Sequence, residues 1–232
     1  MNLTGKRALV TGGAVRIGRA ITEALIAAGV DVIVHYKNSG DNAGTLSQTT
    51  IQADLNDPAQ CETLIARAAE KFGTIDILIN NAAVFYKTGL MESTYEKLLN
   101  ELQPNLFAPL ALMRGFARQM TAGKIINMLD RRITSHDTLC VPYMLGKKGL
   151  EELTKLAALE FAPEITVNAV APGAVLPPPE QANDIAWEPA GKIPLEKRPT
   201  PADIAGAVIY LLKTDVITGQ ILYVDGGQNL LH

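Results

Sequence analysis

The chain has 232 residues, which is enough for one large domain or two small ones. Its 21 basic and 24 acidic residues give a net charge of −3, so we expect no broad electropositive surface and exclude nucleic-acid or membrane binding as the main function. Hydrophobic residues make up 47% and charged residues 19% of the chain, a balance that predicts a folded globular protein and excludes a disordered one.

Cysteine and histidine are few and scattered: Cys61, Cys140, His35, His136 and His232. This pattern predicts neither a structural zinc site nor a disulfide framework, which fits a reducing compartment. The longest uncharged run is broken by prolines, so it is no transmembrane helix, and no signal-peptide core is recognisable. We expect a cytoplasmic protein.

Apolar strands and amphipathic helices alternate from the start of the chain. Asp57 is expected to cap a helix whose first residue is Pro58. In chain order we expect a strand at residues 6–11, a helix ending at Gly29, a strand at 30–36, a short helix within 38–48, a strand at 50–54 and a helix ending at Gly73.

The same alternation continues through the second half of the chain. Thr200 and Asp203 have the spacing of a capping box at the start of a helix. In order we expect a strand at residues 75–80, helices near 93–102 and 105–120, a strand at 124–129, a helix at 142–161, a strand at 165–170, a proline-rich irregular segment with Trp187, a helix reaching Lys213 and a strand at 220–224.

This order predicts a single Rossmann-type α/β domain over residues 1–232, a doubly wound parallel sheet with helices on both faces. Ligands of such sheets bind beyond the carboxyl ends of the strands. Functional residues are therefore expected directly after strands, with residues of about 176–200 as a substrate loop.

A glycine-containing turn follows the first strand. Gly12 and Gly18 allow the backbone to approach a pyrophosphate, which would bind at the amino end of the following helix. The turn does not match G-x-G-x-x-G, so by itself it is either structural or a dinucleotide site. Its position after the first strand of an α/β chain favours the dinucleotide site.

The end of the second strand indicates which dinucleotide binds. The segment from Tyr36 through Lys37 and Asn38 to Ser39 contains no carboxylate that would repel a 2′-phosphate, and the lysine suits one. Arg16 in the glycine turn adds a second cation. These residues predict NADPH as the cofactor, the alternative being that the lysine is an ordinary solvated side chain.

Tyr143 and Lys147 are four residues apart on a predicted helix and share one face. An ammonium beside a phenol lowers the phenol pKa, which would make the tyrosine a usable proton donor. The pair occurs by chance often enough to mean little alone. Its position just beyond the fifth strand is what favours a catalytic role.

Together these motifs resemble, in order and over nearly the whole chain, those of the short-chain dehydrogenase/reductase family. They are Thr11-Gly12, Arg16 to Gly18, Asp54, Asn80 to Ala82, Asn105, Tyr143, Lys147, Pro172-Gly173 and Asp225 to Gly227. The resemblance implies that Tyr143 donates a proton, that Lys147 lowers its pKa and holds the nicotinamide ribose, and that Asn105 joins a water relay. It implies cofactor contacts from Gly12, Arg16, Ile17, Gly18, Tyr36, Lys37, Asn38, Ser39, Asp54, Leu55, Asn81, Ala82, Tyr143, Lys147, Pro172, Gly173 and Val175.

Three departures from the common family pattern resemble its pteridine reductase branch. Asp130 stands thirteen residues before Tyr143, where the family usually has serine, and an ionised carboxylate would repel an ordinary carbonyl oxygen. Arg16 replaces a middle glycine, and Phe85 follows the Asn-Asn-Ala turn. The resemblance implies that Phe85 sandwiches a pterin against nicotinamide, that Arg16 contacts cofactor phosphate and substrate, and that Asp130 with Tyr143 supplies a proton to a ring nitrogen.

The chemistry of a pterin fits these residues. Its flat ring with amide and amino groups suits an aromatic platform and a carboxylate, and reduction of its C=N bond needs a hydride and a proton. Each feature has an alternative interpretation. Phe85 could be a packing residue under a loop, and Asp130 could mark a family member that lost catalysis. Gly146 and Gly149 could let the helix of a neighbouring subunit approach closely, or they could serve local packing.

We therefore expect an NADPH-dependent reductase of a pterin or dihydropterin, dihydrofolate included. Tyr143, Lys147, Asp130 and Asn105 are the expected catalytic residues, and Arg16, Phe85, Asp130 and Tyr143 the expected substrate contacts. The alternatives are a general carbonyl or 3-oxoacyl-thioester reductase of the same family and a catalytically silent NADPH-binding protein. The expected partners are a pterin-like small molecule and further copies of the chain, as a tetramer or dimer, with neither nucleic acid nor membrane.

Overall fold

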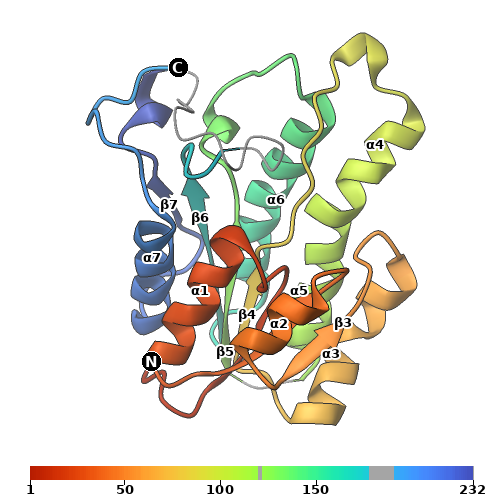
Figure 1. The fold of residues 1–232 in the computed structure, drawn as a ribbon, viewed down its shortest axis with the longest axis vertical. Helices are drawn as coiled ribbons and strands as arrows, with labels where there is room; N and C mark the ends of the chain where they lie inside the picture. Colours follow the sequence, from red (N-terminus) through yellow and green to blue (C-terminus); the bar gives the residue numbers. More distant parts are fainter. Residues whose placement is uncertain (120–121, 178–190, 232) are drawn as a thin grey trace.

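A computed structural model describes residues 1–119, 122–177 and 191–231. Seven parallel strands form one sheet in the order β3-β2-β1-β4-β5-β6-β7, with helices on both faces, as the sequence predicts (Figure 1). The strands are β1 (Arg7–Val10), β2 (Asp31–Tyr36), β3 (Thr50–Gln52), β4 (Ile77–Asn80), β5 (Gly123–Met128), β6 (Ile165–Pro172) and β7 (Ile221–Val224).

Two helical layers cover the sheet. Helices α1 and α7 lie side by side on one face, and α3 and α5 pack together on the other (Figure 1). The helices are α1 (Arg16–Ala27), α2 (Gly40–Leu46), α3 (Pro58–Phe72), α4 (Tyr95–Leu102), α5 (Ala108–Ala117), α6 (Val141–Glu160) and α7 (Pro201–Lys213), with short turns η1 (Leu90–Glu92), η2 (Gln103–Phe107), η3 (Arg131–Thr134) and η5 (Gln228–Leu231).

Strand side chains alternate between the two layers. In β4, Ile77 and Ile79 pack in the core beneath α1 and α7, whereas Leu78 packs in the core beneath α3 and α5. All three are fully buried. A strand covered on both faces needs apolar residues at every position, which explains the continuous apolar runs in the sequence.

Two predicted helix starts are confirmed by their caps. The Asp57 carboxylate accepts hydrogen bonds from the backbone of Ala59 and Gln60 at the start of α3. Thr200 and Asp203 form a reciprocal capping box at the start of α7. In both cases side-chain oxygens satisfy backbone N–H groups that a helix start leaves without partners.

The predicted helix at 105–120 begins too early. The segment Gln103–Phe107 forms a single π-helical turn, and α5 starts only at Ala108. Pro104 lies in this turn and has no N–H group to donate, which interrupts the regular helical hydrogen bonding. A Cβ on Gly146 or Gly149 of α6 would press against this same turn, so the structure favours local packing for both glycines.

The strand order reverses between β1 and β4, the two strands that neighbour each other at the centre. Turns that follow β1, β4, β5 and β6 therefore meet at one edge of the sheet, where ligands of such folds bind. Most of the predicted substrate loop, including Trp187, lies outside the described residues. Among the residues that are described, we find no helix with the length and apolar character needed to cross a membrane.

Candidate active site

The turn between β1 and α1 forms a backbone cradle. Gly12 has a φ of +59°, and a Cβ on Gly18 would overlap the Gly12 carbonyl oxygen and lie 2.6 Å from the Asn81 amide nitrogen. Val15 at the N-cap position has no side chain that caps α1. The amino end of α1 is therefore an anion site of the kind that a pyrophosphate needs.

The same turn is tied to the neighbouring strands. The Thr11 hydroxyl oxygen accepts hydrogen bonds from the backbone N–H groups of Asn81 and Ala82, at 2.9 and 3.0 Å. The Asn81 side chain donates to the Thr11 carbonyl at 2.8 Å. The turns after β1 and β4 thus form one unit, and both line a groove together with Tyr143.

His35 supports this unit from the second strand. Its Nδ1 accepts the Gly12 N–H at 3.1 Å, and its Nε2 lies 3.1 Å from the Ala53 carbonyl oxygen. Burial lowers the pKa of His35 to about 4, so the ring is neutral at neutral pH, with Nε2 as the donor. No role of His35 is predicted from the sequence. Its only signal was a titratable side chain inside an apolar strand.

Arg16 lies in the groove beside the glycine turn, and its Nη2 donates to the Pro177 carbonyl at 2.6 Å. Its φ of +53° is in the left-handed region, which explains why glycine is common at this position. The expectation that Arg16 is a second cation for the 2′-phosphate stays a prediction. Arg16 shares a groove with Tyr143, whereas Lys37 lines two other hollows.

The predicted reacting residues come together at the ends of β4 and β5. The Tyr143 hydroxyl donates to Asp130 Oδ2 at 3.0 Å. The Phe85 ring meets the Tyr143 ring edge to face, with centroids 4.9 Å apart. One turn along α6, the Lys147 ammonium donates to the Met128 carbonyl at 2.7 Å. Tyr143 and Lys147 are buried, whereas Phe85 is 44% exposed and available to a ligand.

Burial and the neighbouring carboxylate dominate the acidity of Tyr143. Its pKa is raised well above the ordinary value, first by burial and then by Asp130. Burial lowers the pKa of Lys147 to about 8, opposed by the same carboxylate. The net direction is upward because burial and the carboxylate that accepts the hydroxyl hydrogen bond outweigh the cation, and the expectation that Lys147 lowers the pKa of Tyr143 stays a prediction.

Asn105 lies in the π-helical turn and is fully buried. Its Nδ2 donates to the Val84 carbonyl at 2.8 Å, and its Oδ1 accepts the Val84 N–H at 3.0 Å. Both ends of the amide are used on the residue that precedes Phe85. The side chain therefore positions the aromatic loop, and the predicted water relay stays a prediction.

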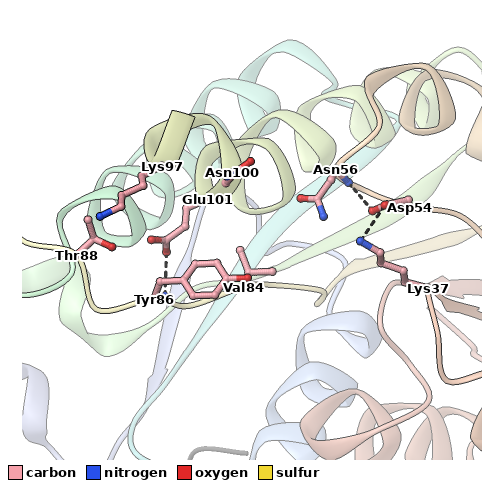
Figure 2. A pocket seen from close by; sticks show the side chains of 9 residues that line it. All are labelled: Lys37, Asp54, Asn56, Val84, Tyr86, Thr88, Lys97, Asn100 and Glu101. Atoms are coloured by element: carbon pink, nitrogen blue, oxygen red, sulfur yellow. Dashed lines mark hydrogen bonds and ion pairs between the residues drawn. The ribbon is translucent and has the colours of Figure 1, made fainter. Parts of the chain in front are cut away.

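The end of β2 lies next to the end of β3. Figure 2 shows Lys37 and Asp54 facing each other across this edge, joined by an ion pair of 2.8 Å. The end of β2 itself contains no carboxylate, but Asp54 from the adjacent strand supplies one beside Lys37. Partial burial works to raise the pKa of Asp54, but hydrogen bonds from Lys37 and Asn56 outweigh it and lower the pKa.

The other predicted cofactor residues surround these two regions. Tyr36 is half-buried at the end of β2, Asn38 lines a hollow with Lys37, Ser39 precedes α2, and Leu55 is buried beside Asp54. At the end of β6, the Gly173 N–H donates to the Val224 carbonyl at 3.0 Å, and Val175 is buried. Ile17 lines the groove with Ala82.

Comparisons with known proteins agree with this geometry. Residues 13–229 match a family model described as Enoyl-(Acyl carrier protein) reductase. The chain is 33% identical to pteridine reductase 1 of Leishmania tarentolae, with 98% of this chain and 97% of that protein covered. It is 32% identical to the 3-oxoacyl-(acyl-carrier-protein) reductase FabG of Staphylococcus epidermidis, with 96% and 98% covered. A solved structure of FolM alternative dihydrofolate reductase 1 from Brucella canis, complexed with NADP, has a TM-score of 0.89 at 29% identity and covers 100% of this chain and 97% of that chain.

Proposed function

Because the chain belongs to the short-chain dehydrogenase/reductase family, we propose that it is an NADPH-dependent reductase that adds a hydride and a proton across a C=N bond of a pterin or dihydropterin. The observation that carries the proposal is the 3.0 Å hydrogen bond from the Tyr143 hydroxyl to Asp130, beside the exposed ring of Phe85. An acid pair and an aromatic platform at one place suit a flat, nitrogen-rich ring.

The chain is an NADP-dependent oxidoreductase by its family and structural relatives. The cradle fits the cofactor, because the lack of a side chain on Gly18 lets α1 pack directly on the Gly12 backbone, and no side chain caps the amino end of α1, which lines the groove. We assign the pyrophosphate to that helix end, the 2′-phosphate to Lys37 and the adenine to Asp54 and Leu55. The nicotinamide ribose is assigned to Tyr143 and Lys147, and the remaining contacts to Asn81, Ala82, Pro172, Gly173 and Val175. When bound, NADPH supplies the hydride.

The residues of this chain supply the proton and the orientation. As the ring carbon of the substrate accepts the hydride, the C=N π electrons become a lone pair on nitrogen, and Tyr143 releases its hydroxyl proton to that nitrogen. The Lys147 ammonium stabilises the phenolate that remains. Asp130, which already shares the hydroxyl proton, orients the phenol and is the route by which the proton is replaced.

The carboxylate distinguishes this chemistry from ordinary ketone reduction. A carbonyl oxygen gains negative charge as its carbon accepts hydride, and Asp130 would oppose that charge. The amide and amino N–H groups of a pterin are instead donors that a carboxylate accepts. The favoured substrate is therefore a ring with donors near its C=N bond.

One assay separates the alternatives. NADPH oxidation is followed in parallel with dihydrobiopterin, dihydrofolate and an acetoacetyl thioester, and Tyr143→Phe serves as the inactive control. The proposal expects turnover of at least one of the first two compounds. Turnover of the thioester alone would support the oxoacyl reductase alternative, which the similarity to FabG favours. Cofactor binding with no turnover of any substrate would favour the silent protein.

A homo-oligomer remains part of the proposal. Leu145, Leu156 and Leu159 are exposed along α6, and Leu99 is exposed on the neighbouring α4. Light scattering coupled to size-exclusion chromatography tests this part. A monomeric mass at micromolar concentration would refute it.

A further inference from the structure

The side chain of Arg132 in η3 lies against the aromatic platform. Its guanidinium carbon lies 5.2 Å from the centroid of the Phe85 ring, within the range of a cation–π interaction. The Nε lies 4.0 Å from Asp130 Oδ1, and Nη1 lies 3.8 Å from Asp137 Oδ2. The guanidinium is thus held between two carboxylates and one ring.

The backbone of Arg132 contacts the same aspartate. Its N–H donates to Asp130 Oδ1 at 2.8 Å, while Oδ2 of that carboxylate accepts the Tyr143 hydroxyl. Both carboxylate oxygens are therefore used, one by η3 and one by α6. Rotation of the Asp130 side chain would break one of these two hydrogen bonds.

These contacts close a ring of four side chains. Tyr143 bonds to Asp130, Asp130 pairs with Arg132, Arg132 stacks on Phe85, and Phe85 meets Tyr143 edge to face. One member of the ring is the proposed proton donor, one is the carboxylate that orients it, and one is the proposed substrate platform. Arg132 joins the two functions.

We propose that Arg132 is a positioning residue for this site, and that its guanidinium holds the Asp130 carboxylate on the Tyr143 hydroxyl and the Phe85 ring beside it. The proposal rests on the proposed function, because it assigns Asp130 and Phe85 their roles. It predicts that the fork shape and the charge of arginine both matter, since one contact is a cation–π contact of the guanidinium with a ring and the other an ion pair.

The positive charge of Arg132 also affects the pKa of Tyr143. Burial and Asp130 raise the pKa of this tyrosine, and Arg132 acts in the opposite direction. A carboxylate in place of a neutral hydroxyl therefore comes with a compensating cation two residues later. Besides each other, Tyr143 and Arg132 have the following charged or titratable neighbours: Asp130, Asp137, Cys140 and Lys147. Arg16 lines the same groove as Tyr143.

The test compares Arg132→Met, which keeps length and loses charge, with Arg132→Lys, which keeps the charge. Arg131→Met makes the same charge change one residue earlier in the same turn. In Arg132→Met we expect kcat to fall at least about tenfold and the alkaline limb of its pH profile to move to higher pH, because Tyr143 loses a neighbouring cation. Arg132→Lys is expected to keep the pH profile of the wild type but only part of its kcat. Arg131→Met is expected to change neither.

A measurement without substrate separates this inference from the proposed function. With tyrosine labelled at Cζ, the Tyr143 resonance is assigned by its loss in Tyr143→Phe, and NADPH binding checks that each variant is folded. We expect the resonance to move in Arg132→Met and to stay in Arg131→Met. Equal shifts or equal losses of kcat in both variants, or an unmoved resonance and pH profile in Arg132→Met, would overturn the inference. Thioester-only turnover by the wild type would overturn the pterin assignment and leave the resonance test valid.

Discussion

The two ends of the proposed NADPH site are built differently. At the reacting end, Tyr143 is 7% and Lys147 3% exposed, and each has a hydrogen-bond partner within the chain. At the adenosine end, the side chains of Lys37 and Asp54 are 49% and 34% exposed and share one ion pair. Buried hydrogen bonds between charged and polar groups hold geometry strongly, whereas an exposed ion pair contributes only about 0–1 kcal/mol. The reacting end is therefore preorganised, and the adenosine end is adjustable.

The largest effect is expected from removal of one atom at the preorganised end. Tyr143→Phe keeps the ring that packs against Phe85 and removes the hydroxyl that donates to Asp130. Loss of a positioned proton donor costs about 10²- to 10⁴-fold in rate, and we expect about a thousandfold fall in kcat. Steady-state kinetics measure it, and NADPH affinity from fluorescence titration is the control. A loss of less than tenfold would mean that another group donates the proton.

The same contrast explains what the sequence could predict. Tyr143 and Lys147 are brought together by helical spacing, and Asp130 lies only thirteen residues away, so this group is visible in a linear pattern. The pairing of Lys37 with Asp54 depends on two separate strands, β2 and β3, and their register of Tyr36 against Gln52. Neither strand end, taken alone in the sequence, indicates which side chain faces it across the sheet. Asp54 and Lys37 were each expected to contact the cofactor, but the ion pair between them was not predicted.

Energetic quantities were harder to predict than positions. The helical spacing of Tyr143 and Lys147 correctly indicated neighbours, but the net pKa shift depends on burial and on Asp130, which no spacing gives. In the sequence Arg132 is one of two adjacent arginines, a pair that is more often solvated than in contact with an anionic substrate tail. Its stacking on Phe85 depends on where the loop after β4 lies against η3.

The next largest effect concerns His35, which joins the glycine turn to the adenosine end. The folded chain protonates it near pH 4 and the unfolded chain near pH 6.5, so between these values the unfolded state holds the extra proton. Stability is therefore full above about pH 6.5 and falls as the pH is lowered toward 4, by about 3 kcal/mol. Urea unfolding followed by circular dichroism at several pH values measures this change.

His35→Asn is the matched control for this pH dependence. Asparagine retains an acceptor for the Gly12 N–H but does not titrate. We expect a less stable variant whose free energy of unfolding changes less across this window. The comparison also removes the contribution of Glu101, whose pKa is raised by burial and which acts in the opposite direction. Equal slopes in both proteins would show that His35 is not the titrating group.

A smaller, substrate-dependent effect is expected at Asp130. Asp130→Ser removes the charge that suits a nitrogen ring and opposes a carbonyl oxygen. We expect kcat/KM for the dihydropterin to fall about tenfold or more and that for the thioester to rise. The alkaline limb of the pH profile should move to lower pH, because Asp130 contributes to the raised pKa of Tyr143. No loss on the dihydropterin would contradict the role of the carboxylate.

The smallest effect is expected at the adjustable adenosine end, where variants of Lys37 and Asp54 test whether Lys37 binds the 2′-phosphate. In the structure Asp54 competes for this lysine, so Asp54→Asn should widen the preference for NADPH over NADH by about two- to fivefold, the range that an exposed ion pair allows. Lys37→Ala should narrow the preference, and high salt should narrow it in the wild type. In the double variant Lys37→Ala/Asp54→Asn, the increase in NADPH preference caused by Asp54→Asn should vanish if Asp54 acts through Lys37. It should persist if Asp54 repels the phosphate directly. A ratio that changes in neither single variant would place the 2′-phosphate away from Lys37.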